Sequence, residues 1–197
     1  MTEVMETNQT GNKNKAFLFP FIAVLIGSLM LVATIFMPFA TATDDYKEYL
    51  QEYSDEMYAE ELDMTNGDAI NISLFEFGKL YAAASEMGMS ESIAIACLIL
   101  IIGYGVLSVL TLLFSVLKKP IAAIIFNLLS FGIFYLTRWD FEDRGVIPSN
   151  SYDWGFAQYI CYIGVLIVLI GAVALLVVKI KNKKEKKAAL IKENTEE

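Results

Sequence analysis

The stretch WGFAQYICYIGVLIVLIGAVALLVV, which runs from Trp154 to Val178, contains no charged side chain. Lysines follow it directly, beginning with Lys179 and Lys181. An α-helix rises 1.5 Å per residue, so about 20 consecutive apolar residues are enough to cross the roughly 30 Å hydrocarbon layer of a bilayer. The stretch exceeds this requirement, and we therefore predict a transmembrane helix at residues 154–178.

Three further blocks of the chain are equally free of charge: Ala16–Phe39, Ser92–Leu117 and Ile121–Leu136. We extend the third and shortest block by Thr137, because Lys119 and Arg138 at its ends can reach the membrane surface. Hydrophobic residues make up 56% of the chain and charged residues only 19%. The sequence predicts an all-α fold class, a four-helix transmembrane bundle with a small, mostly helical extracytoplasmic cap. Its helices are expected at 16–39, 92–117, 121–137 and 154–178.

The distribution of lysine and arginine predicts the orientation of this bundle. Residues 1–15, 118–120 and 179–197 together carry eleven of these side chains, whereas the longer segments 40–91 and 138–153 carry four. Cytoplasmic loops are the ones enriched in lysine and arginine. We therefore expect a multi-pass protein of the cell membrane, in contact with the lipid bilayer, with both termini in the cytoplasm.

The end of the first block permits two interpretations. Ala40-Thr41-Ala42 follows Pro38 and has the small residues at alternate positions that signal peptidase requires. The apolar run before it is about 22 residues long, however, and the apolar core of a signal peptide has about 7–15. We favour a retained helix that ends at Pro38, and cleavage after Ala42 stays open as the alternative.

The segment 40–91 is strongly acidic and forms the predicted cap. Thirteen aspartates and glutamates lie between residues 41 and 91, against two lysines. Apolar residues and tyrosines recur at helical spacing over 44–63, which predicts an amphipathic helix there. The pair Ser73 and Glu76 has the spacing of a capping box and predicts a second helix at about 74–87.

Between these helices, the alternation in Ile70–Ile72 indicates a short strand that pairs with Phe39–Thr43.

One side of the first cap helix is a candidate partner-binding face. Tyrosine buries a large apolar area while keeping a polar tip, which suits both a core and a binding surface. The surrounding acids would attract a cation or a basic partner. The alternative is that the tyrosines form the core of the cap. The candidate face consists of Tyr46, Tyr49, Tyr53, Glu52, Glu56 and Glu60.

Four residues within the spans are candidates for helix packing. Ala157, Gly164 and Gly171 are seven residues apart and therefore share one face of the fourth helix. Asn127 is the most polar residue within a span, and such side chains commonly hydrogen-bond between membrane helices. The sequence leaves open whether the small-residue face meets a helix of the same chain or of a second copy in a homo-oligomer.

The sequence contains none of the usual catalytic or metal-binding sets. It has no histidine, and its spans contain no charged residue, which argues against proton-coupled transport. A calcium loop starting at Asp63 fails, because Asp68 stands where glycine is needed and Leu74 where glutamate is needed. Cys97 and Cys161 are expected to be buried thiols, with a disulfide between two spans as the alternative. We expect no enzyme activity, no cofactor, no metal site and no nucleic-acid partner.

These observations favour a non-enzymatic accessory, scaffold or immunity-type membrane protein that uses its acidic cap for interaction with a protein partner. The alternative is a small oligomeric permease or channel, which would associate through the small-residue face.

Overall fold

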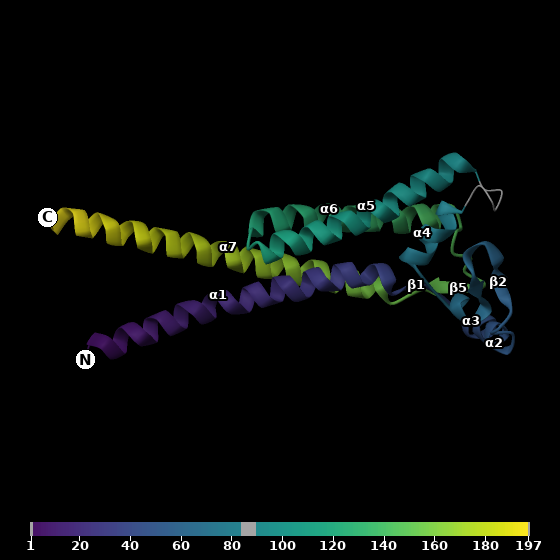
Figure 1. Cartoon of the computed structure of the whole chain (residues 1–197), viewed down its shortest axis with the longest axis horizontal. Helices are drawn as coiled ribbons and strands as arrows, with labels where there is room; N and C mark the ends of the chain where they lie inside the picture. Colours follow the sequence, from purple (N-terminus) through teal and green to yellow (C-terminus); the bar gives the residue numbers. More distant parts are fainter. Residues whose placement is uncertain (1, 84–89, 197) are drawn as a thin grey trace.

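The computed structural model describes residues 2–83 and 90–196, and the chain is mostly helical. Four long helices lie side by side, and a smaller region, which we call the head, sits at the end of the bundle opposite to both termini (Figure 1). The head consists of residues 34–83 and 144–156. The four long helices are α1 (Thr2–Ala33), α5 (Glu91–Val116), α6 (Pro120–Asp143) and α7 (Ala157–Glu196).

Four stretches are long and apolar enough to cross a membrane: 17–36 in α1 and the turn after it, 91–116 in α5, 120–143 in α6 and 157–185 in α7. The helix ends differ from the expected bounds. α1 ends at Ala33, and a short 3-10 turn, η1 (Thr34–Phe36), follows it. Met37 is then extended, which is the conformation that a residue before a proline prefers. α6 continues to Asp143, so 138–143 are helical rather than part of a loop. α7 continues through the lysine-rich segment to Glu196.

α1 and α7 approach each other closely because glycines lie at their contact. A Cβ atom built on Gly27 would lie 2.9 Å from the carbonyl oxygen of Gly164. A Cβ atom on Gly171 would lie 2.8 Å from Cγ2 of Val24 and 3.1 Å from the carbonyl oxygen of Pro20. Only glycine allows the two backbones to come this close.

The other helices are joined by hydrogen bonds between small polar side chains. The hydroxyls of Ser108 in α5 and Ser130 in α6 are 2.9 Å apart. Ser28 in α1 and Ser115 in α5 are hydrogen-bonded at 2.8 Å. The phenol of Tyr104, which is fully buried, donates to the carbonyl oxygen of Leu31 at 2.9 Å. These hydroxyl groups therefore have partners inside the apolar bundle, where an unpaired polar group would be costly.

The head contains more β-structure than the mostly helical cap that was expected, in two small sheets. β1 (Pro38–Ala42) is the central strand of an antiparallel sheet, between β4 (Asn71–Ser73) and β5 (Tyr152–Trp154). The predicted pairing of 39–43 with 70–72 is confirmed, since Ala40 and Thr41 lie opposite Ile72 and Asn71. Ala40 and Ala42 are buried in this strand. Cleavage after Ala42 would therefore remove the centre of the sheet.

The expected helix over 44–63 is wrong beyond Glu52. Here α2 (Asp44–Glu52) ends, and the chain continues as β2 (Met57–Ala59), a 3-10 turn, η2 (Glu60–Leu62), and β3 (Met64–Thr65), which pairs with β2. α3 (Asn66–Ala69) follows.

The reason for the early end of α2 lies in residues far along the chain. The side chain of Asn66 donates to the carbonyl oxygen of Tyr53 at 2.9 Å, and the amide of Gly67 donates to that of Ser54 at 3.1 Å. The last carbonyl groups of a helix have no partner within the helix. These two bonds pair such groups after α2, so the chain can turn there.

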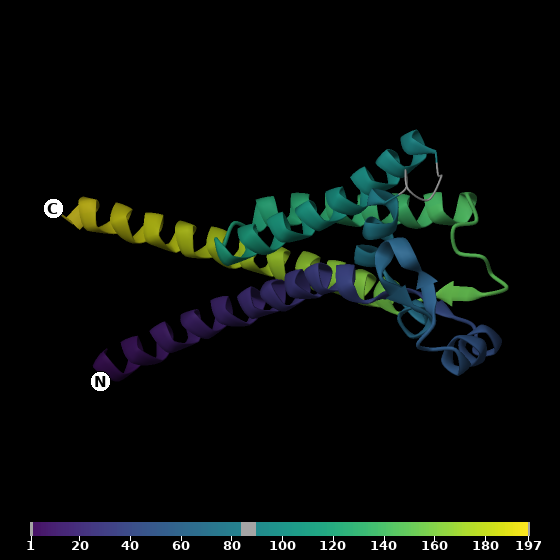
Figure 2. The ribbon, with the colours of Figure 1, turned by 45° about the vertical axis from the view of Figure 1, so that its right-hand side comes forward.

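The capping box at the start of α4 (Leu74–Ala82) is confirmed. The Glu76 carboxylate accepts from the Ser73 amide at 2.6 Å and from its hydroxyl at 2.8 Å, and the Glu76 amide donates back to the hydroxyl at 3.2 Å. The expected end at 87 lies outside the described residues, since 84–89 are not described. α4 packs against α5, as the second view of the chain also shows (Figure 2).

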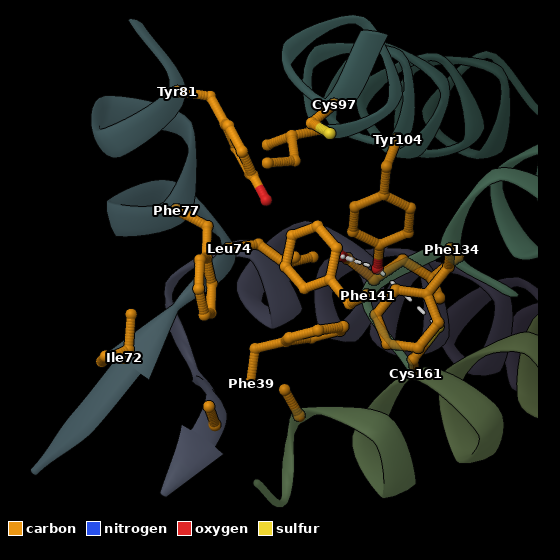
Figure 3. Packing of buried hydrophobic residues seen from close by; sticks show 14 of the residues in the cluster. Phe39, Ile72, Leu74, Phe77, Tyr81, Cys97, Tyr104, Phe134, Phe141 and Cys161 are labelled. Atoms are coloured by element: carbon orange, nitrogen blue, oxygen red, sulfur yellow. Dashed lines mark hydrogen bonds between the residues drawn. The ribbon is translucent and has the colours of Figure 1, made fainter. Parts of the chain in front are cut away.

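The ring of Phe39 connects the head to the bundle. It is fully buried and makes edge-to-face contacts with four other rings, at centroid distances of 5.6 to 6.2 Å. Figure 3 shows Phe39 beside Phe77, Phe134 and Phe141. These rings come from α4 and α6, and the fourth is Trp154 of β5. A single side chain of β1 therefore fixes three elements relative to one another.

We predict that Gly27→Ala destabilises the protein, because the new methyl group would clash with the backbone of α7. Overpacking of this kind costs about 1–3 kcal/mol. The matched control is Gly132→Ala, where a Cβ atom meets nothing within 4 Å. Thermal unfolding in mild detergent, followed by circular dichroism, should show a lower midpoint for Gly27→Ala only. Equal midpoints for the two variants would contradict the close contact of α1 with α7.

Candidate functional site

The candidate partner-binding face is partly exposed and partly packed. On α2 the rings of Tyr46 and Tyr49 stack at 6.1 Å with an interplanar angle of 10°, and Tyr49 and Tyr53 lie 5.2 Å apart. Tyr49 is 52% exposed and Tyr53 is 39% exposed. The carboxylates of Glu52, Glu56 and Glu60 belong to exposed residues. Glu56 lies between α2 and β2 and Glu60 begins η2, so the expectation that all six residues share one side of a helix is wrong. We still call the six residues, Tyr46, Tyr49, Tyr53, Glu52, Glu56 and Glu60, the tyrosine–acid face.

Tyr46 supports this face from the inside. Its ring packs edge-on against Tyr152 of β5 at 5.5 Å, and the Tyr152 hydroxyl donates to the carbonyl oxygen of Ala69 at 2.9 Å. Burial, and next the neighbouring Tyr58, raise the pKa of Tyr46 to about 12. The phenol is therefore neutral at physiological pH. Tyr46 is partly buried and packs against the core, whereas Tyr49 and Tyr53 are exposed, so only these two tyrosines remain open to a partner.

The helix-packing candidates lie inside the bundle. Gly164 and Gly171 contact α1 of the same chain, and Ala157 is fully buried at the start of α7. An oligomer formed through this face would have to displace α1. The side-chain amide of Asn127 donates to the carbonyl oxygen of Val165 at 3.2 Å, which joins α6 to α7. Its other polar atom, Oδ1, has no hydrogen-bond partner among the described residues.

A cavity of about 680 Å³ lies between the head and the first turn of α5. Its walls are mostly apolar and include Ile72, Phe77 and Leu80 from the head and Ile93 and Ala94 from α5. In Figure 3, Ile72, Phe77 and Tyr81 lie on the head side of the buried cluster. The volume falls within the range of about 300–1,000 Å³ that is typical of small-molecule sites.

One wall of the cavity carries a polar cluster centred on Arg144. Its guanidinium forms a salt bridge with Asp140, donates from Nε to Oδ1 of that carboxylate at 3.0 Å, and donates from Nη2 to Sγ of Cys97 at 2.8 Å. The Tyr81 hydroxyl also interacts with the guanidinium. Burial lowers the pKa of Arg144, but the hydrogen bonds to Asp140 and Tyr81 outweigh this effect, so the pKa is raised. The guanidinium is therefore permanently charged.

Both cysteines are free thiols, so the disulfide alternative is not the arrangement found. Cys97 contacts Arg144 and Cys161 contacts Tyr104. Within 2–83 and 90–196, no group of three or more histidine, cysteine, aspartate or glutamate side chains is arranged to hold a metal ion. Comparisons of the chain with protein-family models, with curated proteins and with solved structures give no match. Function must therefore be argued from the two surfaces described above.

The sequence indicated the tyrosine–acid face but not the cavity. The tyrosines and acids lie within one short segment, and their spacing is readable as a pattern. The cavity instead combines residues from five strands (β1 to β5), from η2, α4 and α5, and from the segment after α6. In the sequence, Arg144 counts only among the four positive side chains of 40–91 and 138–153. Its position, seven residues after the predicted span 121–137, did not indicate a cavity.

We predict that the folded protein loses stability as the pH rises from about 10 towards 12. Burial, followed by the nearby Cys97, raises the pKa of Tyr81 to about 12, whereas its ordinary value is 10.0. The unfolded chain therefore releases this proton first, which favours unfolding in that interval. Tyr81→Phe should show a smaller fall in unfolding midpoint over this pH range than the unmodified protein. Tyr49→Phe, which removes an exposed phenol, is the control, and identical profiles for both variants would contradict the prediction.

Proposed function

We propose that the chain is a four-pass membrane protein whose head lies outside the cytoplasm and whose termini lie inside it. Four stretches long and apolar enough to span support the passes. The excess of lysine at the end that carries the termini supports the orientation, because positive side chains are retained on the cytoplasmic side. Lys118 lies near this end, with its ammonium group over the rings of Phe17 and Phe21 at 5.6 and 5.1 Å.

This placement predicts which introduced cysteines a membrane-impermeant maleimide can reach in intact cells. Glu56→Cys in the head should be labelled directly. Lys187→Cys near the C-terminus should be labelled only after the cells are made permeable. The native cysteines are both buried, which keeps the background low. Labelling of Lys187→Cys in intact cells would reverse the proposed orientation.

We further propose that the protein is a non-enzymatic accessory or scaffold protein. In this role the tyrosine–acid face binds a basic segment of a partner protein. The observation that carries this proposal is the exposure of Tyr49 and Tyr53 next to acids with almost no compensating positive charge. Aromatic side chains at the centre of a patch and charges at its rim are typical of protein interfaces. Complementary charge increases the rate and the specificity of association.

The packing beneath the face favours recognition by a preformed surface. Tyr46 is held by Tyr152, and α2 is fixed at its end by Asn66. Rings that are already stacked lose little conformational freedom on binding, which reduces the entropic cost of association. The alternative of an oligomeric permease gains no support from the small-residue face, because α1 covers that face.

The test is photo-cross-linking from position 49 in native membranes. A benzoylphenylalanine placed at Tyr49 should capture one stoichiometric partner, and the cross-linked peptide should be rich in lysine and arginine. Glu52→Lys combined with Glu56→Lys should reduce capture about tenfold, since each exposed ion pair contributes up to about 1 kcal/mol. Capture should also weaken as the salt concentration rises.

The matched control is Glu142→Lys combined with Asp143→Lys, which makes the same change of charge at the exposed end of α6. Capture should be unchanged in this variant. If both double variants capture equally, or if the captured peptide is acidic or apolar, the proposed interaction is wrong.

A further inference from the structure

The cavity beside Arg144 lies at the level where the candidate spans meet the head. Ile93 and Ala94 on its wall belong to the first turn of α5, and Arg144 directly follows α6. In a membrane, an apolar cavity at this level adjoins a large supply of amphipathic molecules. This argument rests on the proposed membrane placement but is independent of the proposed protein partner.

The walls of the cavity divide into an apolar part and a polar part. Aliphatic and aromatic side chains such as Ile72, Leu80 and Ile147 form most of the lining. The polar part is formed by Arg144 with the hydroxyl groups of Tyr81, Tyr58 and Ser90. A ligand that fits both parts has an apolar chain and a polar head. Burial of the apolar chain stabilises the complex by about 25 cal/mol per Å² of apolar area.

The guanidinium retains donor capacity for such a head. It has five N–H donors, and the contacts with Asp140, Cys97 and Tyr81 use at most four of them. Tyr81, Tyr58 and Ser90 lie on the same wall, where the hydroxyl of Tyr58 also contacts that of Tyr152 at 3.4 Å and the hydroxyl of Ser90 contacts that of Ser92 at 3.2 Å. The wall is therefore rich in donors, and its complement is an acceptor group such as a carboxylate or a phosphate.

One acidic side chain, Glu76, also lines the cavity. Its oxygen Oε2 is already bound by the amide and the hydroxyl of Ser73. The carboxylate lies in the first turn of α4, where the helix dipole offsets negative charge. Glu76 is thus engaged in capping, which leaves Arg144 as the charged group on the wall with donors to spare.

We propose that this cavity binds a single-chain lipid from the membrane, with its chain along the apolar walls and an anionic carboxylate or phosphate at Arg144. The ligand class follows from the joint requirement for one apolar chain, an acceptor-rich head and access from the bilayer. The head of the protein is then a lipid-binding module as well as a surface for a partner.

The test uses the full chain reconstituted in nanodiscs of phosphatidylcholine, with a photoactivatable, alkyne-bearing palmitic acid as the probe. Cross-linked residues are mapped by mass spectrometry. We expect labelling of peptides from α4, the first turn of α5 and the segment that follows Arg144. Labelling confined to the lipid-facing sides of α5 to α7 would overturn the proposal.

The discriminating variant is Ile93→Trp, which fills the cavity from an exposed position where the larger ring disturbs little of the core. The matched control is Ile95→Trp, two residues along the same helix, equally exposed and outside the cavity. Labelling in the cavity should fall at least about fivefold in Ile93→Trp and stay unchanged in Ile95→Trp. Equal labelling in both variants would overturn the proposal, and resistance to carbonate extraction shows separately that each variant is in the membrane.

The role of Arg144 is tested by Asp140→Asn combined with Arg144→Gln, which removes both charges so that neither is left unpaired. The unmodified protein should prefer oleate over methyl oleate as a competitor of the probe by about tenfold, and the double variant should lose this preference. Competition by oleate identifies a carboxylate ligand, and competition by lysophosphatidylethanolamine identifies a phosphate ligand. If neither compound competes, the cavity does not bind this class of lipid.

Discussion

The packing of Phe39 is the interaction on which the arrangement of head and bundle depends. Strand β1 passes through the middle of the head sheet, and Phe39 extends from it into a set of rings contributed by α4, α6 and β5. Each edge-to-face pair contributes about 0.5–1.5 kcal/mol of stability beyond that gained from burying the rings. The same strand serves both surfaces, because Ala40 of β1 lines the cavity and α2, which carries Tyr46 and Tyr49, contacts β1.

A second constraint is the close approach of backbones at two levels of the molecule. At the sheet, a Cβ atom on Gly155 would lie 2.1 Å from the carbonyl oxygen of Pro38, so only glycine fits there. The Gly155 amide donates to the carbonyl oxygen of Phe39 at 2.8 Å. Within the bundle, Gly27 and Gly164 allow the same proximity of α1 and α7. Because glycine permits contact at both levels, these two helices stay paired from the sheet into the bundle.

The features that the sequence predicted well are those set by short stretches. Apolar length located the four long helices, and the spacing of Ser73 and Glu76 located the start of α4. The end of α2 could not be predicted, because it depends on hydrogen bonds from Asn66 and Gly67, more than ten residues away. The cavity could not be predicted either, since it exists only where nine segments of the chain meet. The tyrosine pattern indicated a face but could not assign Tyr46 to the core and Tyr49 to the surface.

The connection of the sheet to the bundle has a mechanical consequence. β1 follows α1 after η1 and one further residue, and β5 is joined to α7 by two residues. Because β1 and β5 pair with each other, the sheet holds the adjoining ends of α1 and α7 together. α5 and α6 form a hairpin joined by a short turn at the far end. A pull or twist applied to the sheet is therefore transmitted along α1 and α7 to both tails at once, with the α5–α6 hairpin as a lateral brace.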